Sequence, residues 1–470
     1  MSVQEIHGIF QFADDFFPEE DGVNVFVLPD YVPKTVFPQW YLEEQDDPSS
    51  VFKARLDHLY YTGKYDEACE LGHEHINIYC TGPLAWAMGR YLVRFAQIRE
   101  DFRLDELRAI CLTSPFWVAH FENDEEVRRV LSRAILIREI VELLAEGDSV
   151  DSLVACTRTL PTEYYEPYKT FAFRFVVDDY MRKICLEEQV ALINKFSFMP
   201  LLGPVSMTDA KVTFSIHCDA VAGRNYLGRL IGPGSRDLID RFNLKKRGYL
   251  GTTSMDSELS LVMCNLACVS SGNLVYDPFV GTGSLLCTSA FFGGFPIGSD
   301  IDGRQMRGSD GRSIQSNMRQ YNVENRFIGG CVFDILQHPW RDGFLVDAIL
   351  TDPPYGVRAG AKKIGCKYES PPSYSCRLSA EETAERYPKT IPYEMVDLAQ
   401  DLHQFALKFL RIGGRLVYWY PMEINEDESR STKDQLLSVL PKVDGIEIVS
   451  VIFQQCRLFD RWLVTFERTC

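Results

Sequence analysis

The sequence predicts an α/β protein whose C-terminal half folds as a doubly wound parallel sheet. From about residue 250, short apolar segments alternate with helical segments, the pattern of strands joined by crossover helices. A glycine turn follows the first of these strands, and a proline pair follows a later one. Ligands of such sheets bind at the carboxyl ends of the strands, so both turns are candidate site elements.

In this half, each expected element follows from a change in residue pattern. Runs of β-branched and aromatic residues predict strands, and longer apolar stretches predict helices. The expected strands are 274–276, 296–300, 330–334, 347–352 and 415–420, and the expected helices run to about 292 and over 313–320.

The region upstream has a mixed α+β pattern and no catalytic motif, so binding is its expected role. Alternating apolar residues predict four strands there, and amphipathic spacing predicts two helices. These are strands 90–96, 116–121, 171–177 and 212–217 and helices 104–110 and about 125–144.

The first 87 residues differ from both regions. Residues 1–50 contain eleven acidic residues and one lysine without a sustained period, which indicates a solvated, largely disordered arm. Residues 51–87 have the pattern of a helix, a turn at Gly63 and a second helix, and they resemble one tetratricopeptide-type unit. We therefore expect an arm at 1–50, a helical hairpin at 51–87, the α+β region at 88–220 and the sheet domain at 221–470.

Charge and composition exclude several classes of protein. The net charge is −17, from 66 acidic and 49 basic residues, and the arm accounts for −10 of it, so a local basic surface elsewhere is compatible with the total. The sequence has no apolar run of membrane-spanning length, and its 14 cysteines include no C-x-x-C pair. We expect a cytoplasmic or nuclear protein with reduced thiols, without a membrane partner and without a bound metal.

The glycine turn contains Gly281 and Gly283 and opens a helix. Glycine lets a backbone approach a ligand closely, but a packing turn or a nicotinamide-cofactor site has a similar pattern. Asp277 begins the turn, and its carboxylate disfavours a pyrophosphate but favours a cationic cofactor. Asp300 ends the next strand 23 residues later, close to the spacing at which a carboxylate reaches ribose hydroxyls. S-adenosyl-L-methionine, which has a sulfonium, an ammonium group and no phosphate, meets these requirements.

The strongest signal is the segment Asp352-Pro353-Pro354-Tyr355 at the end of a later strand. The exocyclic amine of a nucleobase is a poor nucleophile, so its methylation needs acceptors that hold the N–H bonds as positive charge develops. Asp352 supplies a carboxylate, and Pro353 supplies a carbonyl on a chain that the next proline stiffens. Tyr355 is suited to stack on a flipped base. The alternative is an ordinary strand-ending turn, which the glycine turn in the same sheet disfavours.

With both motifs, the sequence resembles a known family over about residues 88–470. This family is the catalytic subunit of eukaryotic tRNA (guanine-10-N2) methyltransferase. The motif at 352–355 alone is shared with other amino-directed methyltransferases, including some that act on DNA, so longer segments narrow the match. The matching segments are 102–107, 114–117, 226–230, 236–239, 245–256, 298–302 and 413–419.

The resemblance implies a Rossmann-like methyltransferase sheet that uses S-adenosyl-L-methionine, with residues 352–355 binding the target base. Several of the implied cofactor residues have structural alternatives, namely helix capping for Asp302 and Asp334 and core packing for Met255. The implied cofactor-binding residues are Asp277, Phe279, Gly281 and Gly283 around the cofactor, Asp300 or secondarily Asp302 at its ribose, Asp334 at its adenine amine, and Thr253, Ser254 and Met255 at its methionine end.

The resemblance also implies that region 88–220 is a THUMP-type RNA-binding module that recognises tRNA largely by shape. The link between residues 107 and 114 is shorter than in the family, so the first subdomain is expected to be trimmed. A small zinc-binding activator subunit that pairs with the catalytic sheet is the implied protein partner. The candidate phosphate contacts are Lys245, Lys246, Arg247, Arg358, Lys362 and Lys363.

We therefore expect monomethylation of the exocyclic N2 amine of guanosine 10 in tRNA. Two alternatives stay open at this point. One is the same chemistry on another nucleic acid, such as adenine N6 in DNA or ribosomal RNA, and the other is a catalytically inert interaction protein. A dehydrogenase is more distant, because the turn lacks the third glycine of the dinucleotide fingerprint.

Overall fold

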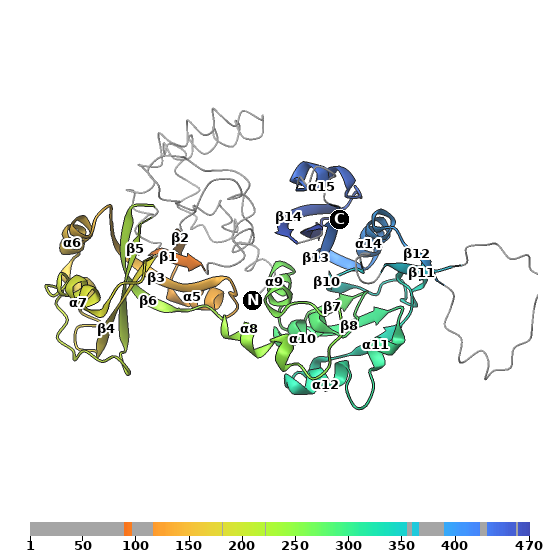
Figure 1. Cartoon of the computed structure of the whole chain (residues 1–470), viewed down its shortest axis with the longest axis horizontal. Helices are drawn as coiled ribbons and strands as arrows, with labels where there is room; N and C mark the ends of the chain where they lie inside the picture. Colours follow the sequence, from red (N-terminus) through yellow and green to blue (C-terminus); the bar gives the residue numbers. More distant parts are fainter. Residues whose placement is uncertain are drawn as a thin grey trace, which may run out of the picture. The chain divides into compact units, whose positions relative to one another are not determined.

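The computed structural model divides into two compact units, with the boundary between Arg236 and Asp237, and each unit is described by itself (Figure 1). The acidic arm expected at 1–50 and the hairpin expected at 51–87 lie outside the described residues. The structure describes residues 89–95, 116–180, 182–220, 222–354, 360–365, 390–423, 430–456 and 459–470.

The N-terminal unit is built around one six-stranded sheet, which confirms the predicted α+β character of this region. Helices α5 and α6 pack against strands of the sheet. The elements are β1 (Gly89–Phe95), β2 (Phe116–Phe121), α5 (Asp124–Leu131), β3 (Ile137–Gly147), α6 (Val150–Arg158), η2 (Thr162–Tyr165), β4 (Phe173–Tyr180), α7 (Leu186–Asn194), β5 (Val212–Asp219) and β6 (Arg224–Pro233).

The strand order β2-β1-β3-β6-β5-β4 places β6 in the middle of this sheet. Strand β6 pairs antiparallel with both β3 and β5, whereas β4 and β5 are parallel. The expected boundary at 220/221 falls just before β6 and would remove this central strand from its sheet. The division after Arg236 differs because the backbone hydrogen bonds of β6 are all made within the N-terminal unit.

The long helix expected over about 125–144 is wrong. Helix α5 ends at Leu131, and strand β3 begins at Ile137 and pairs with both β1 and β6. Buried residues alternate in β3 from Val141 to Ala145, as in a strand with one covered face. Pairing on both sides therefore outweighs the helical spacing of the local sequence.

The C-terminal unit is a seven-stranded sheet with helices on both faces, and this confirms the predicted doubly wound fold. Among the described residues of this unit, α14 is the longest helix, and it follows β12. The elements are α8 (Asp237–Arg241), η3 (Leu244–Lys246), α9 (Ser257–Leu266), β7 (Leu274–Asp277), α10 (Ser284–Phe291), β8 (Phe295–Asp300), α11 (Gly303–Arg307), α12 (Ile314–Gln320), η4 (Glu324–Arg326), β9 (Gly329–Val332), η5 (Ile335–Gln337), β10 (Val346–Thr351), β11 (Lys362–Ile364), β12 (Thr390–Pro392), α14 (Met395–Phe409), β13 (Leu410–Met422), α15 (Lys433–Val439), β14 (Ile446–Gln455) and β15 (Asp460–Arg468).

The strand order is β14-β15-β13-β10-β7-β8-β9. Strands β7, β8, β9, β10 and β13 run parallel, and β15 runs antiparallel to both of its neighbours. The chain proceeds outward from β7 through β8 to β9, then returns to β10 on the other side of β7. The order of the strands therefore reverses between β7 and β10, where a sheet of this kind binds its ligand.

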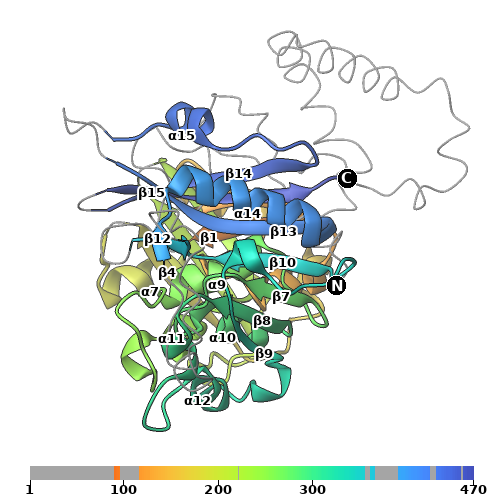
Figure 2. The ribbon, with the colours of Figure 1, turned by 90° about the vertical axis from the view of Figure 1, so that its right-hand side faces the viewer.

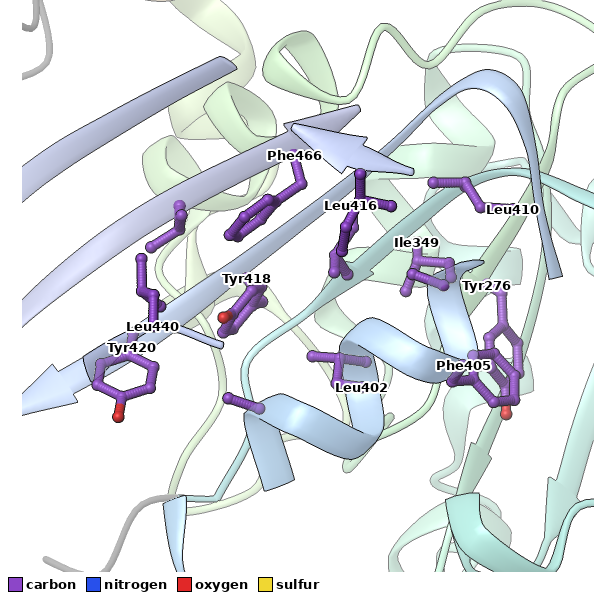
Figure 3. Packing of buried hydrophobic residues seen from close by; sticks show 14 of the residues in the cluster. Tyr276, Ile349, Leu402, Phe405, Leu410, Leu416, Tyr418, Tyr420, Leu440 and Phe466 are labelled. Carbon is purple, nitrogen blue, oxygen red and sulfur yellow. The ribbon is translucent and has the colours of Figure 1, made fainter. Parts of the chain in front are cut away.

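The helices form two layers. Helices α14 and α15 share a core with one face of the sheet, and α14 lies along β13 (Figure 2). Helix α10 packs on β7 and β8 from the other face, with α9 beside it. In Figure 3, Leu402 and Phe405 of α14 point toward the sheet residues Ile349 and Tyr276.

This core makes Phe405 a sensitive position for stability. Its side chain is 6% exposed and stacks on Tyr276 with the ring centroids 5.3 Å apart. We expect Phe405→Ala to lower the free energy of unfolding by about 3–5 kcal/mol, because truncation leaves a cavity. Val396→Ala, which changes an exposed residue of the same helix, is expected to cost under about 0.5 kcal/mol. Urea titrations of both variants measure the difference, and equal losses would contradict this account of the core.

Candidate active site

The glycine turn and the proline turn leave the same edge of the sheet from neighbouring strands. Strands β7 and β10 are parallel, with Val275 opposite Ala348 and Tyr276 opposite Ile349. The buried Thr351 hydroxyl at the end of β10 donates a 2.7 Å hydrogen bond to Oδ1 of Asp277 at the end of β7. The two turns therefore meet at the reversal of strand order.

Asp277 is almost completely buried at this edge. Its Oδ1 also accepts a hydrogen bond from the Phe279 backbone N–H at 3.0 Å, so the carboxylate fixes the first residues of the glycine turn. Burial raises the pKa of Asp277 to about 7, with smaller upward contributions from the charges of Asp300 and Asp352, while the bonds from Thr351 and Phe279 oppose the rise. A cation bound beside Asp277 would favour the ionised carboxylate.

The glycines of the turn are required by its geometry. Gly281 has φ +52° and Gly283 has φ +78°, in the left-handed region that residues with side chains rarely adopt. A side chain at Gly283 would place its Cβ 2.9 Å from Cγ2 of Ile314. Gly283 is also the N-cap of α10, and no side chain caps that helix. The end of the turn thus presents the positive end of a helix dipole.

Asp300 ends β8 and binds the same turn. Its Oδ2 accepts a 2.8 Å hydrogen bond from Gly281 N–H, and its Oδ1 accepts one of 2.8 Å from Asp302 N–H. Burial raises the pKa of Asp300 above the ordinary value. Asp302 instead caps α11 and forms a bidentate ion pair with Arg304, which lowers the pKa of Asp302. Asp300 is therefore the acid of the pair that faces the glycine turn.

Asp334 follows β9 and is buried. Its side chain caps η5 by accepting from Leu336 N–H at 3.0 Å, as the capping alternative expected, and also accepts from Ile364 N–H at 2.6 Å. The second bond ties β11 to the end of β9. The loop after the third parallel strand is thus held beside the segment that follows the proline turn.

The segment at 253–255 lies against the glycine turn. The hydroxyl oxygens of Ser254 and Thr282 are 2.9 Å apart, and Asp256 caps the following helix α9. Met255 is 5% exposed, so its side chain is part of the core. The structure brings Ser254 to the turn, whereas Thr253 is exposed and Met255 is part of the core. The predicted contacts of these three residues with a cofactor stay a prediction.

The proline turn is described as far as Pro354. Pro353 is buried, whereas Asp352 and Pro354 are partly exposed at the carboxyl edge. Tyr355 and Arg358, both predicted site residues, lie outside the described residues. Thr351 is a site residue that the sequence analysis did not predict. The pattern that could have indicated it is a polar side chain at the end of an apolar strand, directly before Asp352.

The predicted phosphate-binding residues do not all lie at the surface. Lys245 and Lys246 are exposed on η3, and Lys362 is exposed on β11, while Lys363 lies over the ring of Tyr393. Arg247 corrects the prediction, because it is 5% exposed. Its guanidinium donates to Ser284 Oγ at 2.6 Å and to the Tyr321 hydroxyl at 3.1 Å. Arg247 therefore has a structural role in the C-terminal unit.

Two features are absent from the described residues. No group of three or more His, Cys, Asp and Glu side chains in this part of the chain converges as metal ligands do. Within the same residues, no helix combines the length and apolar character needed to cross a membrane.

The fold and the site define a Rossmann-like, S-adenosyl-L-methionine-dependent methyltransferase with an N-terminal THUMP region. Family models agree with both parts: the Tmrp11 THUMP N-terminal domain matches residues 89–236, and the RMKL-like methyltransferase domain matches residues 245–367.

Relatives identify the particular family. The tRNA (guanine(10)-N(2))-methyltransferase of Schizosaccharomyces pombe is 39% identical over 363 residues, covering 76% of this chain and 74% of that protein. The mouse (Mus musculus) tRNA (guanine(10)-N(2))-methyltransferase TRMT11 is 33% identical over 378 residues, covering 72% of this chain and 81% of its own. Among solved structures, TrmN from Thermus thermophilus matches with a TM-score of 0.38 at 17% identity, covering 81% of this chain and 99% of that one. The chain belongs to the tRNA (guanine(10)-N(2))-methyltransferase family.

Proposed function

We propose that this chain transfers a methyl group from S-adenosyl-L-methionine to the exocyclic N2 amine of guanosine 10 in tRNA, the reaction in the names of its relatives. One observation carries the proposal. The acidic glycine turn and the Asp352-Pro353 turn end adjacent parallel strands, and the bond between Thr351 and Asp277 joins them. A donor and an acceptor bound at these two turns lie side by side.

The part of the site around the glycine turn, here named the donor half, suits a cationic cofactor. Asp277 and Asp300 place two carboxylates at the turn, and neither forms an ion pair among the interactions of the described residues. When bound, S-adenosyl-L-methionine supplies an activated methyl group on a positively charged sulfur. We assign Asp277, Phe279, Gly281 and Gly283 as residues that surround the cofactor. Its ribose is assigned to Asp300, its adenine amine to Asp334 and its methionine end to residues 253–255.

The part of the site around the Asp352-Pro353 turn, here named the acceptor half, orients the base. We assign the Asp352 carboxylate and the Pro353 carbonyl as acceptors for the two N–H bonds of the guanine amine, which leaves the nitrogen lone pair facing the donor half. As the amine nitrogen gains positive charge, the adjacent carboxylate of Asp352 stabilises it. These residues therefore act by positioning and by electrostatics, without a covalent bond to the substrate.

The tRNA contacts and the protein partner are finer proposals. Lys245, Lys246 and Lys362 are exposed bases suited to phosphates, and Lys363 is a further candidate beside them. For the small zinc-binding activator subunit we propose the edge strand β9, which ends the sheet order among the described strands. Ile328 and Val332 at this edge are 54% and 50% exposed. An edge strand with exposed apolar residues offers both backbone groups and contact area to a second chain.

Methyl transfer to defined nucleic acids tests the function. We expect the wild-type chain, with the activator subunit added, to form N2-methylguanosine at position 10 of an unmodified tRNA transcript, and less product without it. Mass spectrometry of the nucleosides identifies the base, and a transcript with adenosine at position 10 is the control. Methyladenine in DNA or ribosomal RNA would instead support the other substrate class. Partner binding without any binding of S-adenosylhomocysteine would support an inert interaction protein.

We also propose a cytoplasmic location, with the nucleus as the alternative. The cysteines of the described residues are all free thiols, as in proteins from reducing compartments. Fractionation of cells that express the tagged full chain distinguishes the two compartments.

A further inference from the structure

The segment 246–255, here named the strap, crosses the elements that surround the glycine turn. Two side-chain amides of α12 bind its first residues. Asn317 accepts from Tyr249 N–H at 3.0 Å and donates to the Tyr249 carbonyl at 2.9 Å. Gln320 accepts from Gly248 N–H at 2.9 Å and donates to the Lys246 carbonyl at 2.7 Å. Because the two amides are three residues apart on one helix, they bind the strap from the same side.

Side chains of the strap extend the same attachment. The guanidinium of Arg247 donates to Ser284, the first residue of α10, at 2.6 Å. The Tyr249 hydroxyl donates to the Gln305 carbonyl on α11 at 2.5 Å. Helices α10 and α11 directly follow the glycine turn and the end of β8, respectively. The first half of the strap is therefore fixed to the helices on which the proposed donor half is built.

The second half of the strap lies on the glycine turn itself. Ser254 Oγ accepts from Gly251 N–H at 2.9 Å and lies 2.9 Å from Thr282 Oγ1. A side chain at Gly251 would bring its Cβ within 2.9 Å of Cγ2 of Thr282. The strap can approach the turn this closely only because Gly251 has no side chain. A shift of the strap thus changes one wall of the donor half directly.

We propose that Asn317 is a positioning residue for cofactor binding, which it controls by setting the position of the strap. Asn317 is completely buried, and both atoms of its amide are used on the backbone of one residue, Tyr249. That pairing needs a donor and an acceptor on two separate atoms at the end of a short side chain, which the amide of Asn provides. Asn317 itself makes no contact with the glycine turn that the structure shows, so it acts through the strap. This inference rests on the assignment of the donor half to S-adenosyl-L-methionine.

The substitution Asn317→Asp keeps the size of the side chain but removes its donor and places a carboxylate against the Tyr249 carbonyl. We expect the Kd for S-adenosylhomocysteine and the KM for S-adenosyl-L-methionine each to rise by about tenfold or more, from the loss of one buried hydrogen bond and the new repulsion. The kcat at saturating cofactor is expected to change less than about twofold, because the acceptor half is untouched. Arg319→Ala, at an exposed position of the same helix, is the matched control with unchanged constants.

A purely structural role would give a different result. The fraction of active enzyme, and with it the apparent kcat, would fall, while the Kd for S-adenosylhomocysteine and the KM for S-adenosyl-L-methionine would stay unchanged. That outcome in folded Asn317→Asp would overturn the inference. If Asn317→Asp does not fold, Gln320→Ala and Tyr249→Phe each remove part of the same attachment from more exposed positions. We expect each to raise the Kd by about three- to fivefold, and unchanged values for both would equally overturn the inference. Calorimetry with S-adenosylhomocysteine needs no turnover, so wild-type binding without tRNA methylation would refute the proposed function separately.

Discussion

Replacement of Asp352 with alanine is expected to reduce methyl transfer to tRNA by about a thousandfold or more while S-adenosylhomocysteine binds within about twofold of wild type. The carboxylate is assigned to the acceptor half, where it orients the amine and stabilises the charge that develops on nitrogen. The donor half keeps Asp277, Asp300 and the glycine turn. The variant should therefore separate turnover from cofactor binding.

Single-turnover methylation and calorimetry measure the two quantities on the same preparation. Asp352→Asn keeps the shape of the side chain and an acceptor oxygen but loses the charge, so its rate is expected to fall between wild type and Asp352→Ala. Asp342→Ala, which changes an exposed carboxylate, is the control for a general loss of negative charge. Near-normal methylation by Asp352→Ala would show that the proline turn does not hold the reacting base.

The second large effect concerns Asp277 and pH. Because burial places the pKa of Asp277 at about 7, the carboxylate is only partly ionised at neutral pH in the free protein. A cationic cofactor prefers the ionised form, so its affinity is expected to increase as the pH rises through about 7 and to level off above about 8. Between pH 6 and pH 8 the expected gain is up to about tenfold.

Asp277→Asn removes the titrating group and keeps the size of the side chain. We expect its cofactor affinity to be about 10- to 100-fold lower at pH 8 and nearly independent of pH. Calorimetric titrations from pH 6 to pH 8.5 measure both effects. A wild-type curve without any slope near pH 7 would exclude Asp277 as the group that responds to the cofactor.

The same shift has a consequence for folding. The folded protein binds a proton at Asp277 up to about pH 7, whereas the unfolded chain loses it near pH 4, so this stability contribution is present below about pH 4 and is lost as the pH rises to about 7. Asp277→Asn should lack this loss and unfold at higher urea than wild type at pH 8. The variant is thus expected to be more stable but to bind cofactor less well.

The order of the main strands and helices of the sheet could be predicted, because the residue patterns that indicate each one lie within a short stretch of sequence. Asp277 and Asp352 each follow a short apolar run directly, and the parallel arrangement then places both at one edge. The sequence could not show the hydrogen bond from Thr351, since it depends on the register between β7 and β10. The helix expected over about 125–144 and the phosphate contact expected at Arg247 are wrong for the same reason, because strand pairing decides the first and burial against Tyr321 decides the second. Strands β14 and β15 were also not predicted.

Asp300 is proposed to bind the cofactor, and it also stabilises the backbone of the glycine turn. Its two oxygens accept from Gly281 and Asp302, so the acid proposed to recognise the sugar also holds the bend in its shape. Replacing Asp300 with alanine removes the proposed ribose contact and the backbone hydrogen bonds together. The measured loss of cofactor affinity will therefore exceed the contribution of either contact alone. Engineers who want a cofactor with an altered sugar must therefore supply two replacement hydrogen bonds for the backbone before they redesign the pocket.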